Sequence, residues 1–216
     1  MDNIYLHAIY AFQNKYNQNE TLRVLKNILK SDAILSRRLQ RYRDPYGFNG
    51  LDYISLCDYD RRNMHHERFP NYTAFKTYVT ESLSIVFPKD KITVIKPQMV
   101  DFIGTEHKNL KTMEELGLSP NKRYSDLYDE VQVKDSVPLS LMSSITMPLQ
   151  KMSKTFYSER IITYLVQKEI EQIKELLIKY NHEVPIYDID TFIPLEDTRN
   201  VKTLVKKYYN KNIVTK

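Results

Sequence analysis

The sequence predicts an α+β protein, with a sheet core, flanking helices and a long helix near the C-terminus. One observation is the order of elements, in which a strand and a helix precede several strands and a final long helix. Another is the composition, because 216 residues with 42% hydrophobic and 27% charged residues are typical of a globular domain. We therefore expect a domain at residues 1–150 and a helical extension with a basic tail at 151–216, packed on the same domain.

The individual elements follow from the spacing of apolar residues. Leucine and isoleucine recur every three or four residues at 21–29 and 158–180, which predicts helices, and a short helix is expected near 109–116. Runs of β-branched and aromatic residues predict strands at 3–10, 51–57, 82–87, 92–95, 128–133 and 184–189, and a short strand or a turn at 141–147. The strands at 82–87 and 92–95 are expected to form a hairpin, and Pro185 indicates that the last strand lies at a sheet edge.

Basic residues are concentrated in two places. The chain has a net charge of +5, and residues 197–216, with five Lys, one Arg and one Asp, account for all of it. Residues 37–43 hold four arginines, a side chain that binds phosphate through paired hydrogen bonds. Both segments are compatible with nucleic-acid binding, and equally with a solvated loop and a solvated tail.

Several kinds of site are excluded or disfavoured. The single cysteine, Cys57, allows no intrachain disulfide, and a lone cysteine in a strand is commonly a buried small residue. His65 and His66 are adjacent and make a poor metal pair, so we expect no metal. The sequence has no P-loop and no GxGxxG motif. No apolar run approaches the roughly 18 residues that span a bilayer, and no signal peptide is visible, so we expect a cytoplasmic protein without a membrane partner.

Three pieces of the sequence are informative in combination. The first joins residues 5–9 (Tyr-Leu-His-Ala-Ile) to 25–29 (Leu-Lys-Asn-Ile-Leu) and 33–36 (Ala-Ile-Leu-Ser). The second is 50–56 (Gly-Leu-Asp-Tyr-Ile-Ser-Leu), and the third is 128–133 (Tyr-Asp-Glu-Val-Gln-Val) followed by 137–139 (Val-Pro-Leu). This order resembles the ADP-ribosyltransferase fold, especially its His-Tyr-Glu branch, which includes diphtheria-toxin-like enzymes and bacterial transferases that modify DNA. The resemblance covers about residues 4–147.

The resemblance implies a split β-sheet and an NAD-dependent ADP-ribosyltransferase that releases nicotinamide and modifies a macromolecule. It implies a histidine on the first strand, a tyrosine on the next and a glutamate opening a late strand, here His7, Tyr53 and Glu130. The residues after His7 differ from the small residue and threonine that are common in the family. Tyr128 stands where arginine-modifying members carry Gln or Glu, which disfavours an arginine acceptor and leaves nucleic acid and protein open.

The chemistry itself can be matched to side chains. Cleaving the bond between nicotinamide and ribose leaves a cation-like ribose, which a nearby carboxylate stabilises, and Glu130 is the candidate. An aromatic face can stack on the nicotinamide, for which Tyr53 is the first choice and Tyr78 the second. The other candidates for binding NAD are His7, Ser55, Arg37 and Arg38, which offer hydrogen bonds to ribose, amide or pyrophosphate. We expect the glutamate, the histidine and the tyrosine to converge on one pocket.

Two other functions fit the same sequence. The basic segments, with tyrosines such as Tyr208 and Tyr209 between the lysines, could make a nucleic-acid-binding protein without enzymatic activity. A protein of the same fold could also bind no NAD and serve as an interaction module through the apolar stripe of the helix at 158–180, although that stripe more simply covers the sheet. Thermal stabilisation by NAD distinguishes an NAD-binding protein from either alternative.

Overall fold

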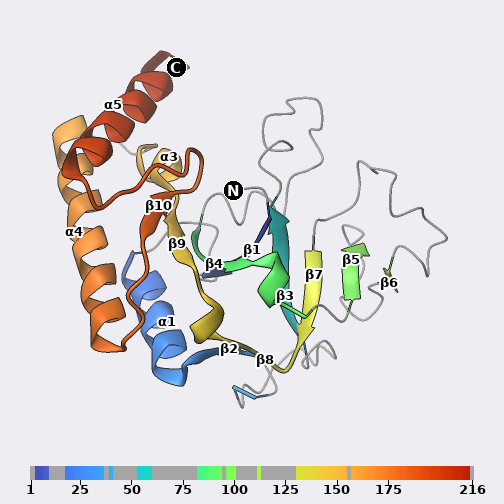
Figure 1. Cartoon of the computed structure of the whole chain (residues 1–216). Coiled ribbons are helices and arrows are strands. Elements are labelled where there is room, and N and C mark those ends of the chain that lie inside the picture. The colour runs from blue at the N-terminus through green and yellow to red at the C-terminus, as the bar shows by residue number, and fades with distance from the viewer. Residues whose placement is uncertain are drawn as a thin grey trace. The chain divides into compact units, whose positions relative to one another are not determined.

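Figure 1 shows the protein as a computed structural model of the 216-residue chain. The structure describes residues 3–9, 18–36, 39–40, 53–59, 82–93, 96–100, 111–112, 130–154 and 157–214. Internal contacts divide the chain into two units whose segments alternate along the sequence, and each is described by itself. Helices and a mixed set of parallel and antiparallel strands confirm the predicted α+β class.

The first unit contains a run of antiparallel strands. They lie in the order β1 (Ile4–Ile9), β3 (Tyr53–Tyr59), β7 (Glu130–Lys134), β5 (Lys96–Val100) and β6 (Lys111–Thr112). The part of β1 that belongs to this unit ends at His7. On β3, successive residues rather than alternate ones are buried, namely Ile54, Leu56, Cys57 and Tyr59. Both faces of β3 are therefore covered, and the expectation that Cys57 is a buried small residue is confirmed.

A two-stranded ribbon belongs to the same unit. β2 (Ala33–Leu35) pairs antiparallel with β8 (Ser136–Pro138), and the buried side chains of Ile34 and Val137 lie on opposite partners. The spacing of apolar residues predicts neither strand, because three residues are too few to show a period of two.

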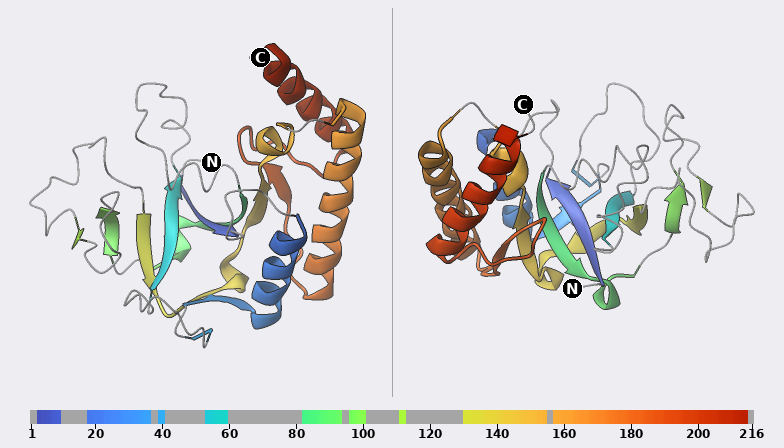
Figure 2. Two further views of the ribbon diagram at one scale, coloured as in Figure 1. Left: turned by 180° about the vertical axis from the view of Figure 1, so that it is seen from behind. Right: turned by 90° about the horizontal axis from the view of Figure 1, so that it is seen from above.

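Among the residues that the structure describes, the second unit contains three further strands. β4 (Leu83–Pro88) pairs antiparallel with β9 (Ser144–Met147), and β10 (Ile186–Asp188) pairs parallel with β9. β10 starts directly after Pro185 and ends the strand order, so the predicted edge strand is confirmed. Figures 1 and 2 show α1 (Gln18–Ser31), in blue, and the C-terminal helices gathered beside β9 and β10.

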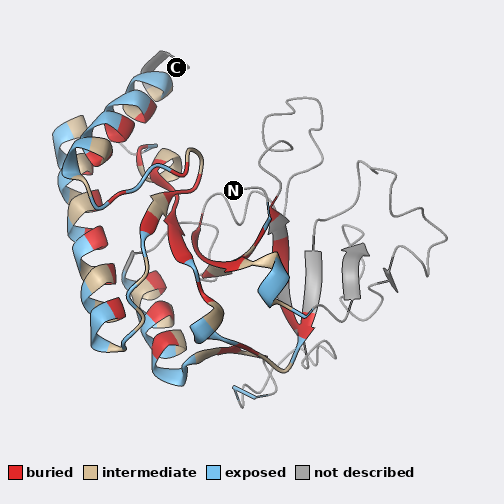
Figure 3. Ribbon diagram, viewed as in Figure 1, coloured by how far each residue is buried: buried red, intermediate tan, exposed pale blue. Residues whose placement is uncertain are grey.

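The long predicted helix is α4 (Glu159–Lys179). The Ser158 hydroxyl accepts a hydrogen bond from the Ile161 N–H at 3.5 Å, which caps the first turn. One face of α4 is buried, through Ile162, Val166, Glu169, Ile170, Ile173 and Leu177. Figure 3 shows the outward side of the same helix in pale blue, so α4 is amphipathic as its spacing predicts. The short helix α3 (Leu149–Met152) precedes it.

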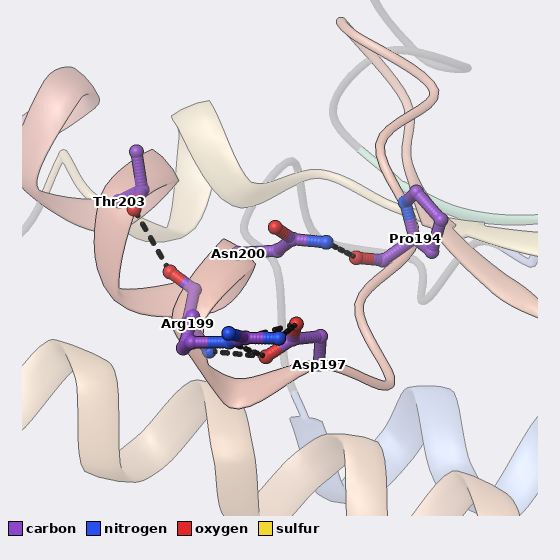
Figure 4. Close-up of polar contacts among 5 residues, drawn as sticks. All are labelled: Pro194, Asp197, Arg199, Asn200 and Thr203. Carbon is purple, nitrogen blue, oxygen red and sulfur yellow. Dashed lines mark hydrogen bonds and ion pairs between the residues drawn. The ribbon is translucent and has the colours of Figure 1, made fainter.

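The basic C-terminal segment forms helix α5 (Thr198–Val214), which contacts α4 and α3. Asp197 caps it, because its Oδ1 accepts the Arg199 N–H at 2.8 Å. The Arg199 guanidinium returns to the same carboxylate, and the Asn200 amide donates to the Pro194 carbonyl at 2.9 Å (Figure 4). The start of α5 is thus fixed to the segment that follows β10.

Three sequence predictions need correction. Residues 92–93 are not a strand, and the chain just before them, at Lys89–Lys91, makes a 3-10 turn. The next strand is β5, which pairs with β7 and β6. The prediction of a hairpin between strands at 82–87 and 92–95 is therefore wrong. At residues 111–112, inside the helix predicted near 109–116, the chain forms β6 instead. The basic tail is helical, and its buried residues Val201, Leu204, Val205 and Tyr208 have the helical spacing that would have predicted it.

Within the described ranges, none of the helices combines the length and the apolar character that crossing a membrane requires.

Candidate active site

Most of the strand-forming residues of the informative pieces lie in the first unit. Leu6 on β1 lies opposite Cys57 on β3, and Cys57 lies opposite Glu130, the first residue of β7. The strands that carry His7, Tyr53 and Glu130 are therefore consecutive neighbours. Because neighbouring strands are about 4.8 Å apart, the backbone of Glu130 lies about 10 Å from that of Leu6.

The register divides the candidate positions into two sets. Cross-strand partners share a face of the sheet, and successive residues alternate between faces. Tyr53 and Ser55 are four and two residues before Cys57 on β3, so their positions are on the same face of the sheet as those of Cys57 and Glu130. We call these positions the set of Glu130.

The register puts the position of His7 on the opposite face of the sheet from that of Glu130. His7 follows Leu6 directly, and Leu6 pairs with Cys57, so the position of His7 belongs to the alternate set. The expected convergence of His7 and Glu130 on one face is therefore not supported by the ladder, since adjacent residues of a strand face opposite sides.

His7 is half-buried, and a positive charge lies on its side of β1. The Lys89 ammonium is 5.4 Å from the centroid of the Tyr5 ring, and Tyr5 is two residues before His7 on the same face. The Lys89 N–H donates to the Asn3 carbonyl at 3.0 Å, which holds the turn after β4 against the start of β1.

The ribbon of β2 and β8 links the segment before Arg37 to the end of β7. The Ser36 N–H donates to the Asp135 carbonyl at 2.7 Å, and the Leu139 N–H donates to the Asp32 carbonyl at 3.1 Å. Asp135 adopts a φ of 61°, which lets the chain turn from β7 into β8. The chain that enters Arg37 therefore starts from a ribbon attached directly to the strand of Glu130.

Some candidates lie beyond what the structure describes. For Tyr53, Ser55 and Glu130 it describes the backbone and not the side chain. The residues wholly outside the described ranges are Arg37, Arg38, His65, His66 and Tyr78.

A buried polar cluster in the second unit was not predicted from the sequence. Asp188, at the end of β10, is fully buried, and its Oδ2 accepts the Tyr208 hydroxyl at 2.6 Å and the Thr191 hydroxyl at 2.7 Å. Tyr208 is only 4% exposed. Tyr208 is therefore not available to bind nucleic acid, as one of the alternatives for this segment supposed, because its ring is packed in the core and its hydroxyl is bound to Asp188.

Burial shifts the carboxyl pKa values in this unit. It raises the pKa of Asp188, although the hydrogen bonds from Tyr208 and Thr191 lower it. Burial and the charge of Asp188 raise the pKa of Asp190 to about 6, while nearby lysines lower it. Burial alone raises the pKa of Glu169 in α4 to about 8. Among the side chains that the structure describes, no three metal-ligating groups lie close enough together to hold a metal ion.

Comparison with known proteins gives one partial similarity. No family model matches the chain. No curated protein matches it either. A solved structure of Thermus sp. 2.9 DarT in complex with NAD+ is similar to it with 16% sequence identity and a TM-score of 0.42, over 88% of this chain and 97% of that chain. A structure of Thermus sp. 2.9 DarT in complex with ADP-ribosylated ssDNA is similar with 16% sequence identity and a TM-score of 0.40, over 88% of this chain and 96% of that chain. A similarity at this level does not establish a common fold, so an assignment of function has to rest on the chain's own residues and strand pairing.

Proposed function

We propose that the protein is an NAD-dependent ADP-ribosyltransferase with Glu130 as its catalytic residue. The observation that carries the proposal is the pairing of the informative pieces. β1, β3 and β7 are consecutive strands, and the segments at 33–35 and 136–138 pair with each other as β2 and β8. Pieces far apart in the sequence are thus paired in two groups, β1, β3 and β7 in one and β2 and β8 in the other, and this supports the resemblance to the transferase fold.

Glu130 would act on the bond between nicotinamide and ribose. Nicotinamide leaves with the bonding electron pair, and positive charge develops on the ribose carbon and ring oxygen. A carboxylate beside this centre stabilises the charge as it forms. An acceptor hydroxyl or amine then attacks the ribose carbon and loses a proton, or water does so and NAD is hydrolysed.

The register supports an assignment of the candidate residues to different parts of NAD. Tyr53 and Ser55 share the set of Glu130, so we assign them to the nicotinamide and its ribose. The position of His7 belongs to the alternate set, together with that of Tyr5, and we assign His7 a more distant hydrogen bond to NAD. Arg37 and Arg38 follow the ribbon attached to β7, which supports their assignment to the pyrophosphate.

The direct test is release of nicotinamide from NAD, measured by chromatography. The purified protein is expected to release nicotinamide, and Glu130→Gln is expected to lower the rate about a hundredfold or more, as removal of a charge-stabilising group does. Glu183→Gln, which neutralises an exposed carboxylate after α4, is the matched control and keeps full activity. Undiminished release by a folded Glu130→Gln protein would overturn the proposal.

The acceptor can be identified with labelled NAD and separate single-stranded DNA, RNA and protein samples. The exposed lysines of α5, which are Lys202, Lys206, Lys207 and Lys211, favour a nucleic acid. Labelling of an oligonucleotide that weakens steeply as salt rises supports this acceptor class, because phosphate contacts release counterions. Label on protein alone contradicts it.

The same lysines support a second candidate, a nucleic-acid-binding protein without enzymatic activity. It predicts a salt-dependent gel shift that disappears when the lysines of α5 are replaced by Gln, together with no thermal stabilisation by NAD.

A further inference from the structure

A second feature, independent of the proposed function, is a line of six exposed residues along the outward side of α4. We call it the α4 seam, and it consists of Ile161, Tyr164, Lys168, Glu171, Glu175 and Ile178. The intervals of three and four residues are those of the a and d positions of a coiled coil. The seam lies opposite the buried residues of α4, which fix the orientation of the helix (Figure 3).

The ends of the seam are apolar and clearly exposed. Ile161 and Tyr164 are 45% and 63% exposed at one end, and Ile178 is 58% exposed at the other. Single exposed apolar residues are normal, but three at a and d spacing on one helix form the line of contact that a second helix needs.

We infer that the α4 seam is a self-association surface, on which α4 of a second copy of this chain packs antiparallel. The centre of the seam lies between Glu169 and Ile170. A two-fold axis there places Ile161 opposite Ile178 of the second copy.

The same axis pairs opposite charges in the middle of the seam. Lys168 lies opposite Glu171 of the second copy, and this pair occurs twice by symmetry. Tyr164 lies opposite Glu175, whose carboxylate can accept the tyrosine hydroxyl. A parallel pair would instead place Lys168, Glu171 and Glu175 each opposite an identical charge, which is destabilising.

The residues that flank the seam are compatible with this arrangement. In an antiparallel pair, Gln167 comes beside Lys174 of the second copy, and Leu165 comes beside Gln172. No like charges meet at these positions. A single helix pair is at the small end of specific interfaces, so we expect a dimer that forms reversibly with concentration.

The first test is a charge exchange measured by sedimentation equilibrium of the full chain. Lys168→Glu is expected to weaken dimerisation about tenfold, because it turns two attractive contacts into repulsive ones. The double variant Lys168→Glu with Glu171→Lys is expected to restore it. Lys202→Glu on α5 makes the same charge change at an exposed position away from the seam and is expected to have no effect.

The second test is orientation. Ile161→Cys and Ile178→Cys proteins are oxidised separately and as a mixture; antiparallel packing predicts disulfide-linked dimers in the mixture only, since the two ends are about 26 Å apart along the helix. Cys57 is 4% exposed and is present in every sample. A monomer up to millimolar concentration, a dimer insensitive to Lys168→Glu, or cross-linking of Ile161→Cys alone would each overturn the inference.

Discussion

At the scale of single residues, burial acts strongly on carboxyl groups of the second unit. Glu169 is 1% exposed, and burial raises its pKa from 4.5 to about 8. An acid whose pKa is raised by folding stabilises the folded state below its unfolded pKa, and this contribution is lost as the pH rises through the folded pKa. Asp190, with a pKa of about 6, acts in the same direction.

This pH dependence of the free energy of unfolding gives the first prediction. The free energy of unfolding should fall between pH 5 and pH 8, and Glu169→Gln should remove much of the fall because Gln has no charge to bury. At pH 9 the variant should be more stable than the wild type by roughly 5 kcal/mol. Urea unfolding at several pH values measures this, and a variant with an unchanged pH dependence would show that Glu169 is solvated.

Tyr208 gives the second prediction. Tyr208→Phe keeps the ring packed and removes the donor to Asp188, leaving a buried carboxyl oxygen without that partner. The cost should be about 1 to 3 kcal/mol at pH 7. Tyr209→Phe, at the next position of α5, is the control, and equal losses in the two variants in urea unfolding would argue against a specific role for the bond.

At the scale of elements, the start of α5 depends on one cap. Asp197→Ala removes the acceptor for the Arg199 N–H and should lower the melting temperature. Asp197→Asn keeps a capping oxygen and loses the ion pair with Arg199, so it should lower the melting temperature less. Thermal unfolding of both variants checks this order, and a reversed order would assign the effect to the ion pair.

The sequence predicts elements well where the spacing runs over several turns or residues. The helix at 158–180 is confirmed because its apolar residues recur at helical spacing and are buried, and the strands at 3–10, 51–57 and 82–87 are confirmed because their runs of β-branched and aromatic residues are largely buried. β2 and β8 are too short to show a period, and the partners of β5 depend on pairing between distant segments. α5 could have been predicted from the spacing of Val201, Leu204, Val205 and Tyr208, but the lysines between them suggested a solvated tail.

The candidate site could be predicted only in part. The resemblance put His7, Tyr53 and Glu130 on three strands, and the structure makes these strands neighbours. The faces could not be predicted, because they depend on the register of Leu6 with Cys57 and of Cys57 with Glu130, which no single segment encodes.

At the scale of the whole molecule, the division into residues 1–150 and 151–216 remains a prediction about folding. β10 pairs with β9, and the Ile145 N–H donates to the Pro185 carbonyl at 3.0 Å. A chain that ends at residue 150 would lose β10 and the buried faces of α4 and α5. If the C-terminal segment is packed on the same domain, this shortened chain should show no cooperative thermal transition for the second unit. A sharp transition in calorimetry would instead make 151–216 dispensable.

If Glu130 acts on the transition state of NAD cleavage, its replacement should change the rate of cleavage and not the binding of NAD. NAD affinity and single-turnover release of nicotinamide are measured in parallel for the wild type and Glu130→Gln. We expect an NAD dissociation constant unchanged within about threefold and a rate constant lowered about a hundredfold or more. An unchanged rate constant, or a loss confined to NAD affinity, would contradict this role of Glu130.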